Sequence, residues 1–347
     1  MTVNAPKTNG QQPRRLLLVS VPRTASNLLL KVLNISNQPN LITSPKCGYF
    51  FYDAFMTAAK DGRLSRPLDQ WTADEKNETK STFQRCFNEL EEYTTRATAE
   101  NKTMFAKEHA FWFVNPGAFT RSLGDTDTPD DLKEFHISLP GSYGPTQTFS
   151  ANNQTVLSDE YLRTWQISFI IRHPALAWPS LYRAMQKLLK EGFIDDDGVK
   201  GVSIVNMTLT YSRNLFDWCI EQPDESVTPL VIDAHDVIHN RAVVTKFCEM
   251  AGLDPTAMQY EWSGAKPQSD HASLGDAEEQ KRIAIFLSTL QESTGIVKEK
   301  APASVDIDAE VAKWRVEFGD DVAQLLEKAT RDSMPDYEYL KAHKVVV

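Results

Sequence analysis

The segment RRLLLVSVPRTASNLLLKVLN, residues 14–34, has the pattern of a strand, a tight loop and a helix. Residues 16–19 form a short continuous apolar run, which is typical of a buried parallel strand. Residues 20–26 are small, hydroxylic or basic and include one proline, as expected for a loop. From residue 27 onward the leucines and valines take helical spacing, and we expect Ser26 or Asn27 to cap that helix.

The loop in this segment has the chemistry of an anion site. A loop that opens a helix after a buried strand directs backbone N–H groups toward an anion. Arg23 adds a positive charge, and Thr24 and Ser26 add hydroxyl donors. It is not a Walker loop, because that motif needs glycines before a lysine and the chain has none between Gly10 and Gly48. Taken alone, the segment fits an ordinary first strand and helix equally well.

Length and composition narrow the class of protein. The 347 residues, 41% of them hydrophobic, suit one large α/β domain or two smaller ones. The net charge of −10 argues against a general nucleic-acid surface. No apolar run approaches membrane-spanning length, and the polar first 15 residues lack a signal-peptide core, so we expect a soluble cytoplasmic protein. The four cysteines are far apart, which predicts reduced thiols and neither a disulfide framework nor a metal site.

Short apolar runs alternate with helical patterns along the rest of the chain. Strands are predicted at residues 103–106, 167–171 and 229–233, and helices at about 82–98, 174–188, 207–219, 240–252, 276–290 and 308–333. This alternation predicts a three-layer α/β/α fold with a central parallel sheet. We expect a disordered tail at residues 1–13 and a single domain over 14–347. Residues of about 120–158 are polar and too long for a simple connection, so we expect a mobile insertion or lid there.

Charged side chains follow the predicted strands. Arg23, Lys107, Arg172 and Asp233 each come at, or just after, a predicted strand end. Ligands of open α/β sheets bind beyond the carboxyl ends of the strands, so these residues are expected to converge. An aromatic cluster, residues 49–56, is interpreted first as packing and second as the wall of an apolar substrate pocket.

Three segments resemble the sulfotransferase superfamily, and in particular its fungal-type members. VPRTASNL, residues 21–28, is similar to the family's 5′-phosphosulfate loop, and FAKEH, residues 105–109, to its K-x-H segment. IRHPALAWPS, residues 171–180, resembles the 3′-phosphate motif, in which a serine follows an arginine by eight positions, as Ser180 follows Arg172. A weaker echo is PLVIDAHDV followed by a helix ending in AGLDP, so the resemblance runs, with gaps, over about residues 15–253.

The chain also departs from the family pattern. Ala25 stands where glycine is commonest, Asn27 where threonine or serine is common, and Arg23 where cytosolic members have lysine. The adenine-side segment K-G-x-x-G-x-W is missing, and Lys313-Trp314-Arg315, residues 313–315, is the substitute the sequence offers.

The resemblance implies a P-loop NTPase-like sulfotransferase fold that binds 3′-phosphoadenosine-5′-phosphosulfate (PAPS) without a metal and releases adenosine 3′,5′-bisphosphate. Arg172 and Ser180 would hold the 3′-phosphate, Arg23 and Lys107 would stabilise the departing phosphate, and His109 would take the acceptor's proton. The residues that would surround the 5′ side are Arg23, Thr24, Ala25, Ser26 and Asn27. Each role has a structural alternative: His109 as a surface or hydrogen-bonded residue, Arg172 as an ion-pair partner, and Thr24 and Ser26 as helix caps only.

We therefore expect an enzyme of secondary metabolism that transfers a sulfuryl group from PAPS to a hydroxyl of a small apolar or aromatic molecule. Nucleic acid and membrane are not expected partners, and a homodimer is one option for the oligomeric state. One alternative is a diverged enzyme that performs elimination, cyclisation or isomerisation. Another is a nucleotide- or metabolite-binding protein without catalysis, against which the Lys107 and His109 pair argues. A P-loop kinase is disfavoured by the missing Walker loop.

Overall fold

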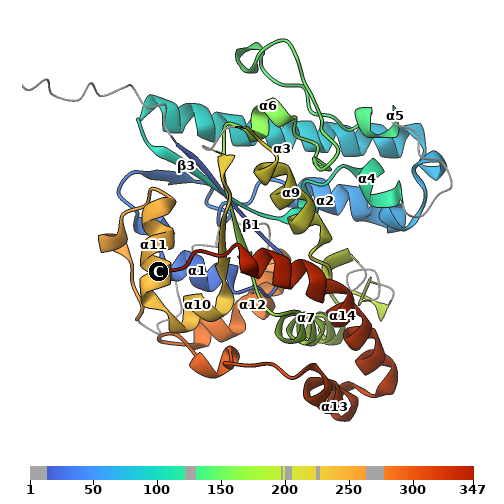
Figure 1. Cartoon of the computed structure of the whole chain (residues 1–347). Helices are drawn as coiled ribbons and strands as arrows, with labels where there is room; N and C mark the ends of the chain where they lie inside the picture. Colours follow the sequence, from blue (N-terminus) through green and yellow to red (C-terminus); the bar gives the residue numbers. More distant parts are fainter. Residues whose placement is uncertain (1–13, 122–129, 197, 200–204, 224–226, 263–276) are drawn as a thin grey trace, which may run out of the picture.

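The computed structural model describes residues 14–121, 130–196, 198–199, 205–223, 227–262 and 277–347. Its centre is a sheet of five strands in the order β2-β3-β1-β4-β5 (Figure 1). The strands are β1 (Arg15–Ser20), β2 (Leu41–Thr43), β3 (Thr103–His109), β4 (Gln166–Ile171) and β5 (Leu230–Asp233). All four neighbouring pairs are parallel, so the predicted α/β fold with a central parallel sheet is confirmed.

Helices cover both faces of this sheet. They are α1 (Ser26–Val32), α2 (Tyr52–Ala59), α3 (Ala73–Ala99), α4 (Pro116–Thr120), α5 (Asp130–Lys133), α6 (Asp159–Leu162), α7 (Pro174–Lys190), α9 (Thr210–Ile220), α10 (Ala234–His239), α11 (Arg241–Met250), α12 (Ala277–Glu292), α13 (Ile307–Phe318) and α14 (Asp320–Ala342). Side chains of α1 and α11 pack on one face, and those of α3, α7, α9 and α14 on the other. Alternate residues of β1 serve the two cores: Leu16 and Leu18 one, Leu17 and Val19 the other.

The central strand β1 sets the position of the site. It pairs with β3 on one side and with β4 on the other, so the carboxyl ends of these three strands lie side by side. In the register, Ser20 at the end of β1 is opposite His109 at the end of β3. The loop that follows β1 therefore runs past the ends of both neighbouring strands, where open α/β sheets bind their ligands.

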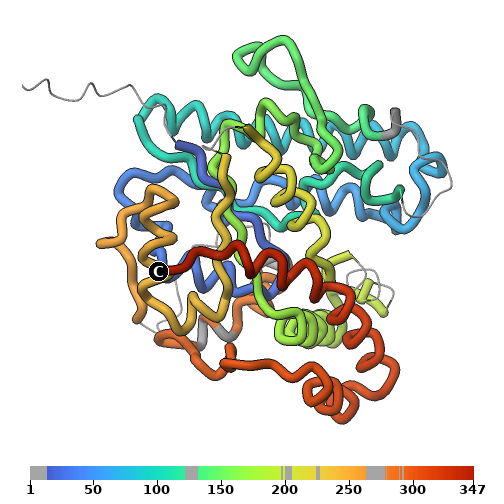
Figure 2. Tube along the Cα trace, viewed as in Figure 1, coloured from blue at the N-terminus to red at the C-terminus, as the bar shows by residue number. Residues whose placement is uncertain are grey.

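The chain ends beside the far edge of the sheet. Figure 2 shows the last residues returning past β5 after α14 has crossed the molecule. The N–H group of Val345 donates a hydrogen bond to the carbonyl oxygen of Val231, at 2.9 Å. Tyr337 of α14 donates a hydrogen bond from its hydroxyl to Asp233 Oδ2, at 2.7 Å, so the last helix is fixed to the end of β5.

Several boundaries differ from those predicted. β2 is a strand that the apolar pattern does not predict, and only three of its residues pair with β3. β3 continues through residues 107–109, where all three residues pair with β1. α3 begins at Ala73 and not near residue 82, because Thr72 and Glu75 form a capping box that starts it nine residues earlier. Gly319, with φ 86, separates α13 from α14 in the stretch predicted as one helix.

The segment predicted as a lid has a described part, residues 130–158. Phe135, Ile137, Val156 and Leu157 are buried in the core that includes α3. Tyr143 donates a hydrogen bond from its hydroxyl to Glu91 of α3, at 2.6 Å. Residues 122–129, and the predicted tail at 1–13, lie outside the described residues, and movement of the segment stays a prediction. None of the described helices is both long and apolar enough to cross a membrane.

Candidate active site

The loop after β1 has two residues in the left-handed region. Arg23 has φ 70 and Ala25 has φ 65, values that side chains other than glycine seldom adopt. α1 begins at Ser26, with Ala25 at the N-cap and no side-chain cap, so the prediction that Ser26 or Asn27 caps the helix is wrong. The Thr24 hydroxyl donates back to the Val21 carbonyl oxygen, at 2.8 Å. The backbone N–H groups of residues 24–26 have no acceptor in the described part of the chain. Successive free N–H groups of this kind form a nest that can bind an anion.

The structure brings Arg23, Arg172 and Ser180 together. Arg23 Nε donates to Ser180 Oγ at 3.0 Å, which ties the loop to α7. Arg172 follows β4, and its Nη1 donates to the Arg23 carbonyl oxygen at 2.9 Å. Its Nη2 donates to the Lys300 carbonyl oxygen at 2.8 Å, while its Nε is buried and has no hydrogen-bond partner among the described residues. Three residues that the sequence places up to 157 positions apart thus form one cluster.

This cluster is electrostatically unbalanced. Burial, and then the charge of Arg23, lowers the pKa of Arg172 to about 10. Burial also lowers the pKa of Arg23. Among the described residues, neither guanidinium forms an ion pair with a carboxylate; their acceptors are neutral oxygens. Buried cations without an anionic partner are costly, and a bound anion would remove that cost.

Lys107 lies on β3 and is fully buried. Its Nζ donates to Asn27 Oδ1 at 2.5 Å, which brings the last residue of the predicted phosphate loop to β3. The same Nζ lies 4.6 Å from the centroid of the Tyr49 ring. Burial lowers the pKa of Lys107 to about 8. The ammonium group therefore faces the loop with one neutral oxygen and one aromatic face around it.

His109 ends β3 and is held by two hydroxyl groups. Ser20 Oγ lies 2.9 Å from Nδ1, and the Tyr49 hydroxyl lies 3.3 Å from Nε2. Burial, and then the charge of Lys107, holds the pKa of His109 well below its usual value. The imidazole is consequently neutral at neutral pH, the form in which it can accept a proton.

Aromatic rings enclose His109. The ring centroids of Tyr49, Phe111 and Trp112 lie 5.5, 5.8 and 4.5 Å from that of His109. The predicted aromatic cluster therefore divides. Phe50 and Phe51 are core residues, whereas Tyr49 contacts the imidazole. The interpretation as core packing holds for the first two, and Tyr49 is part of the site's wall.

Glu108 is a buried residue that the sequence did not single out. It lies between Lys107 and His109 on β3, so its side chain points to the opposite face of the sheet. Its Oε1 accepts the N–H groups of Phe50 and Phe51, at 2.6 and 3.1 Å. Its Oε2 is buried and, within the part of the chain that the structure describes, has no hydrogen-bond partner. Burial raises the pKa of the carboxyl to about 8. Glu108 thus fixes the chain just after Tyr49.

Two other predicted positions do not join the site. Asp233 receives the His235 N–H group and the Tyr337 hydroxyl, both at 2.7 Å, which makes it a helix cap and an anchor for α14. Trp314 is 0% exposed in the core, so its ring cannot serve an adenine. The expectation that residues 313–315 replace the family's adenine-side loop is therefore wrong.

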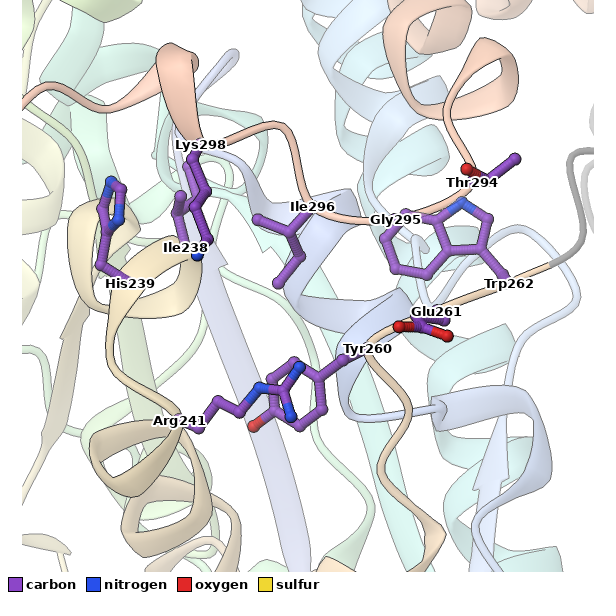
Figure 3. Close-up of a pocket in the computed structure, with 10 residues that line it drawn as sticks. All are labelled: Ile238, His239, Arg241, Tyr260, Glu261, Trp262, Thr294, Gly295, Ile296 and Lys298. Carbon is purple, nitrogen blue, oxygen red and sulfur yellow. The ribbon is translucent and has the colours of Figure 1, made fainter.

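A separate pocket of about 850 Å³ lies near the ends of α10 and α11 (Figure 3). It is lined by Ile238, His239, Arg241, Tyr260, Glu261, Trp262, Thr294, Gly295, Ile296 and Lys298. The Arg241 guanidinium lies over the Tyr260 ring, 4.2 Å from its centroid. Residues 298–301 connect this pocket with the arginine cluster, since Lys298 lines the pocket and the Lys300 carbonyl oxygen accepts from Arg172. The described residues contain no group of three or more His, Cys, Asp or Glu side chains placed to hold a metal ion.

The chain is similar to proteins of known family over nearly its whole length. It is 37% identical over 349 residues to the sulfotransferase ppzF of Metarhizium majus (strain ARSEF 297), covering 97% of this chain and 98% of that protein. The sulfotransferase ppzF of Metarhizium rileyi (strain RCEF 4871) is 36% identical over 343 residues, covering 96% and 97%. No family model matches the chain. Among solved structures, the sulfotransferase domain of the Synechococcus PCC 7002 olefin synthase aligns over 94% of this chain and 98% of that one, with 16% identity and a TM-score of 0.37.

Proposed function

The chain belongs to the sulfotransferase family, and from this premise we propose that it transfers a sulfuryl group from PAPS to a hydroxyl of a small apolar or aromatic metabolite. The observation that carries the proposal is a set of three cations around the loop after β1: Lys107, which is fully buried, and Arg23 and Arg172, which are half-buried. Among the described residues none of the three pairs with a carboxylate. A donor with several phosphate and sulfate oxygens supplies the missing negative charge.

The residues present fit such a donor. Arg172 has a buried Nε without a partner, and the N–H groups of the loop lack acceptors in the described chain. Under the proposal, Arg172 and Ser180 bind the 3′-phosphate by charge-assisted and hydroxyl hydrogen bonds. Arg23 now bonds to Ser180, so the donor must separate these two side chains when it binds.

The catalytic roles follow from position and charge. Sulfuryl transfer moves SO₃ between two oxygens, and cations near the leaving oxygen lower its barrier, as they do in phosphoryl transfer. Lys107 and Arg23 take this role. His109 is neutral, lies at the end of the neighbouring strand and acts as general base for the acceptor hydroxyl. The rings of Tyr49, Phe111 and Trp112 around it suit an aromatic or apolar acceptor.

The first experiment is nucleotide binding. Adenosine 3′,5′-bisphosphate at a hundred times its Kd should stabilise the protein by about 2.7 kcal/mol, and adenosine 5′-monophosphate should do less at equal concentration. The measurement is a thermal scan supported by calorimetry. Absence of both a thermal shift and binding heat contradicts the proposed donor.

The second experiment is a screen of phenols and alcohols with labelled PAPS. A sulfated product identified by mass spectrometry supports the proposal. Binding of the nucleotide without any sulfated product contradicts it, and would favour an elimination or isomerisation enzyme or a binding protein.

A further inference from the structure

Two hydroxyl groups beside His109 favour one tautomer of its ring. The Ser20 hydroxyl donates its one proton to the Glu108 carbonyl oxygen, at 3.3 Å. With this assignment of the hydroxyl proton, the lone pairs of Ser20 Oγ face His109 Nδ1, 2.9 Å away, and the tautomer that satisfies both contacts has its hydrogen on Nδ1. Nε2 of the neutral ring therefore has a lone pair, and it accepts the Tyr49 hydroxyl proton across 3.3 Å.

The residues before and after Tyr49 are both hydrogen-bonded to β3, which fixes the position of Tyr49. On one side, the Gly48 carbonyl oxygen accepts the Lys107 N–H group at 2.9 Å. Gly48 has φ 87, and a Cβ there would lie 3.0 Å from the Lys107 nitrogen, so this close approach requires glycine. On the other side, Glu108 accepts the N–H groups of Phe50 and its neighbour. Two backbone attachments to β3 thus flank the residue.

The Tyr49 ring lies between the groups that the reaction needs. Lys107 Nζ is 4.6 Å from its centroid, and the Trp112 ring is 4.6 Å away on the acceptor wall. Burial raises the pKa of the phenol well above 10, so the hydroxyl keeps its proton and can donate it. Among the described residues, this hydroxyl is the hydrogen-bond partner of His109 Nε2.

We propose that Tyr49 is a further catalytic residue, which carries the proton of the acceptor hydroxyl to His109 Nε2. The inference rests on the proposed function, and it adds a residue between the base and the acceptor. Because the nitrogen that must receive the proton is already bonded to the Tyr49 hydroxyl, the acceptor reaches the base through that hydroxyl.

The step balances in protons and electron pairs. The acceptor's O–H bond breaks and its proton binds to the Tyr49 oxygen, while the proton that Tyr49 carried moves to His109 Nε2. The acceptor oxygen forms a bond to sulfur, and the bond from sulfur to the phosphate oxygen of the donor breaks. Its electron pair leaves with adenosine 3′,5′-bisphosphate. His109 then releases its extra proton to solvent.

The kinetic test uses Tyr49→Phe, which keeps the ring over Lys107 and against Trp112 and removes only the hydroxyl. We expect kcat to fall by about 10²–10⁴-fold with unchanged affinity for adenosine 3′,5′-bisphosphate. The loss should be larger for alcohols than for acidic phenols, because an acidic phenol needs less help to lose its proton. Tyr182→Phe is the matched control, since Tyr182 packs on Phe318 away from the site and its loss should change neither quantity.

The second test needs no acceptor. With ¹⁵N-labelled histidine and His109→Gln to assign the signals, NMR should show the Nδ1–H tautomer in the wild type. In Tyr49→Phe, the Nε2 resonance should shift to higher frequency while the tautomer stays, because Nε2 loses its donor.

The outcomes separate the two proposals. Full turnover in Tyr49→Phe, an equal loss for all acceptors, or an Nε2–H tautomer in the wild type overturns the proton relay and leaves sulfuryl transfer intact. A wild type that binds no nucleotide or sulfonates no acceptor overturns the proposed function, and the relay with it.

Discussion

Arg172 supports the backbone of Arg23: its Nη1 donates a hydrogen bond to the Arg23 carbonyl oxygen at 2.9 Å. The end of β4 is thereby attached to the loop after β1, in which Arg23 has the left-handed φ of 70. The proposed reader of the 3′-phosphate and the proposed 5′ loop are therefore mechanically connected. Substitution of Arg172 should therefore weaken the binding of both the 3′ and the 5′ groups of the nucleotide, and that of the 3′-phosphate most.

Arg172→Ala should weaken adenosine 3′,5′-bisphosphate more than adenosine 5′-monophosphate. A hydrogen bond to a charged group is worth about 1.5–3 kcal/mol, so the ratio of the two Kd values should change by roughly 10- to 150-fold. Arg172→Lys keeps the charge and loses the planar guanidinium, so its ratio of Kd values should lie between those of the wild type and Arg172→Ala. Calorimetry measures the Kd of both nucleotides for the wild type and the two variants. Equal weakening of both nucleotides by Arg172→Ala would show that Arg172 does not read the 3′-phosphate.

His109→Ala should abolish turnover and leave nucleotide affinity nearly unchanged. A base that takes up a proton only as the acceptor reacts acts in the transition state, so its loss lowers kcat by about 10²–10⁴-fold. Lys107→Ala is the contrasting variant: Lys107 meets the donor in the ground state too, so both affinity and turnover should fall. The readouts are calorimetry and product formation on an acceptor from the screen. Retained activity in His109→Ala would place the base elsewhere.

Ala25→Gly should stabilise the protein, the reverse of the usual effect of glycine. Ala25 has φ 65, and a left-handed residue other than glycine costs about 1–2 kcal/mol. Glycine removes that cost but gives the unfolded chain more entropy, which leaves a net gain of roughly 0.5–1 kcal/mol. Urea unfolding measures it. Ala97→Gly, in the buried face of α3, is the control and should lose stability; a loss in Ala25→Gly as well would contradict the strain argument.

Glu108→Gln should make stability less dependent on pH. The pKa of Glu108 is raised to about 8 in the folded state, against 4.5 for the free side chain. Between these values the folded protein holds a proton that the unfolded chain releases, so rising pH destabilises the wild type through this window. The free energy of unfolding of Glu108→Gln, relative to that of the wild type, should rise by up to about 1.4 kcal/mol per pH unit from pH 4.5 to 8. Above pH 8 this difference should stay constant.

The measurement for this variant is urea unfolding at several pH values, with the exposed Glu92→Gln as the control. Glutamine can still accept the N–H groups of Phe50 and Phe51, so the local structure should persist. An advantage that does not vary with pH would mean that the carboxyl ionises in the folded protein at its ordinary pKa.

The parts of the fold that the sequence predicts are those with strong apolar runs. β1, β4 and β5 contain such runs, and their positions are confirmed within about a residue. β2 was missed because three residues of pairing leave no periodic pattern. The apolar pattern predicts this helix only from about residue 82, because the buried face of the first part of α3 uses Thr79 and Thr82. The Thr72–Glu75 capping box is the sequence signal that identifies the earlier start.

The site follows a similar division. Arg23, Lys107, His109 and Arg172 could be named because each stands at or near a strand end, and the topology of a parallel sheet gathers such positions. Tyr49 carries no such signal, and Ser20, although it ends β1, has no charge that would single it out. Tyr49 reaches His109 because Gly48 and Glu108 fix the chain around it, and these are contacts between residues about 60 positions apart. Long-range contacts of this kind have no signature in a single sequence.

The central place of β1 has a consequence for how the protein is made. β1 is translated before its partners β3 and β4, which end at residues 109 and 171. At about 5–20 residues per second, roughly 10–30 s pass between synthesis of β1 and completion of β4. Both edges of this strand of leucine and valine are unpaired until β3 is complete, and one edge stays unpaired until β4 is complete. An unpaired strand edge is the kind of segment that associates with other chains. Efficient production of the protein in a foreign host should therefore depend on the chaperones that bind such segments at the ribosome.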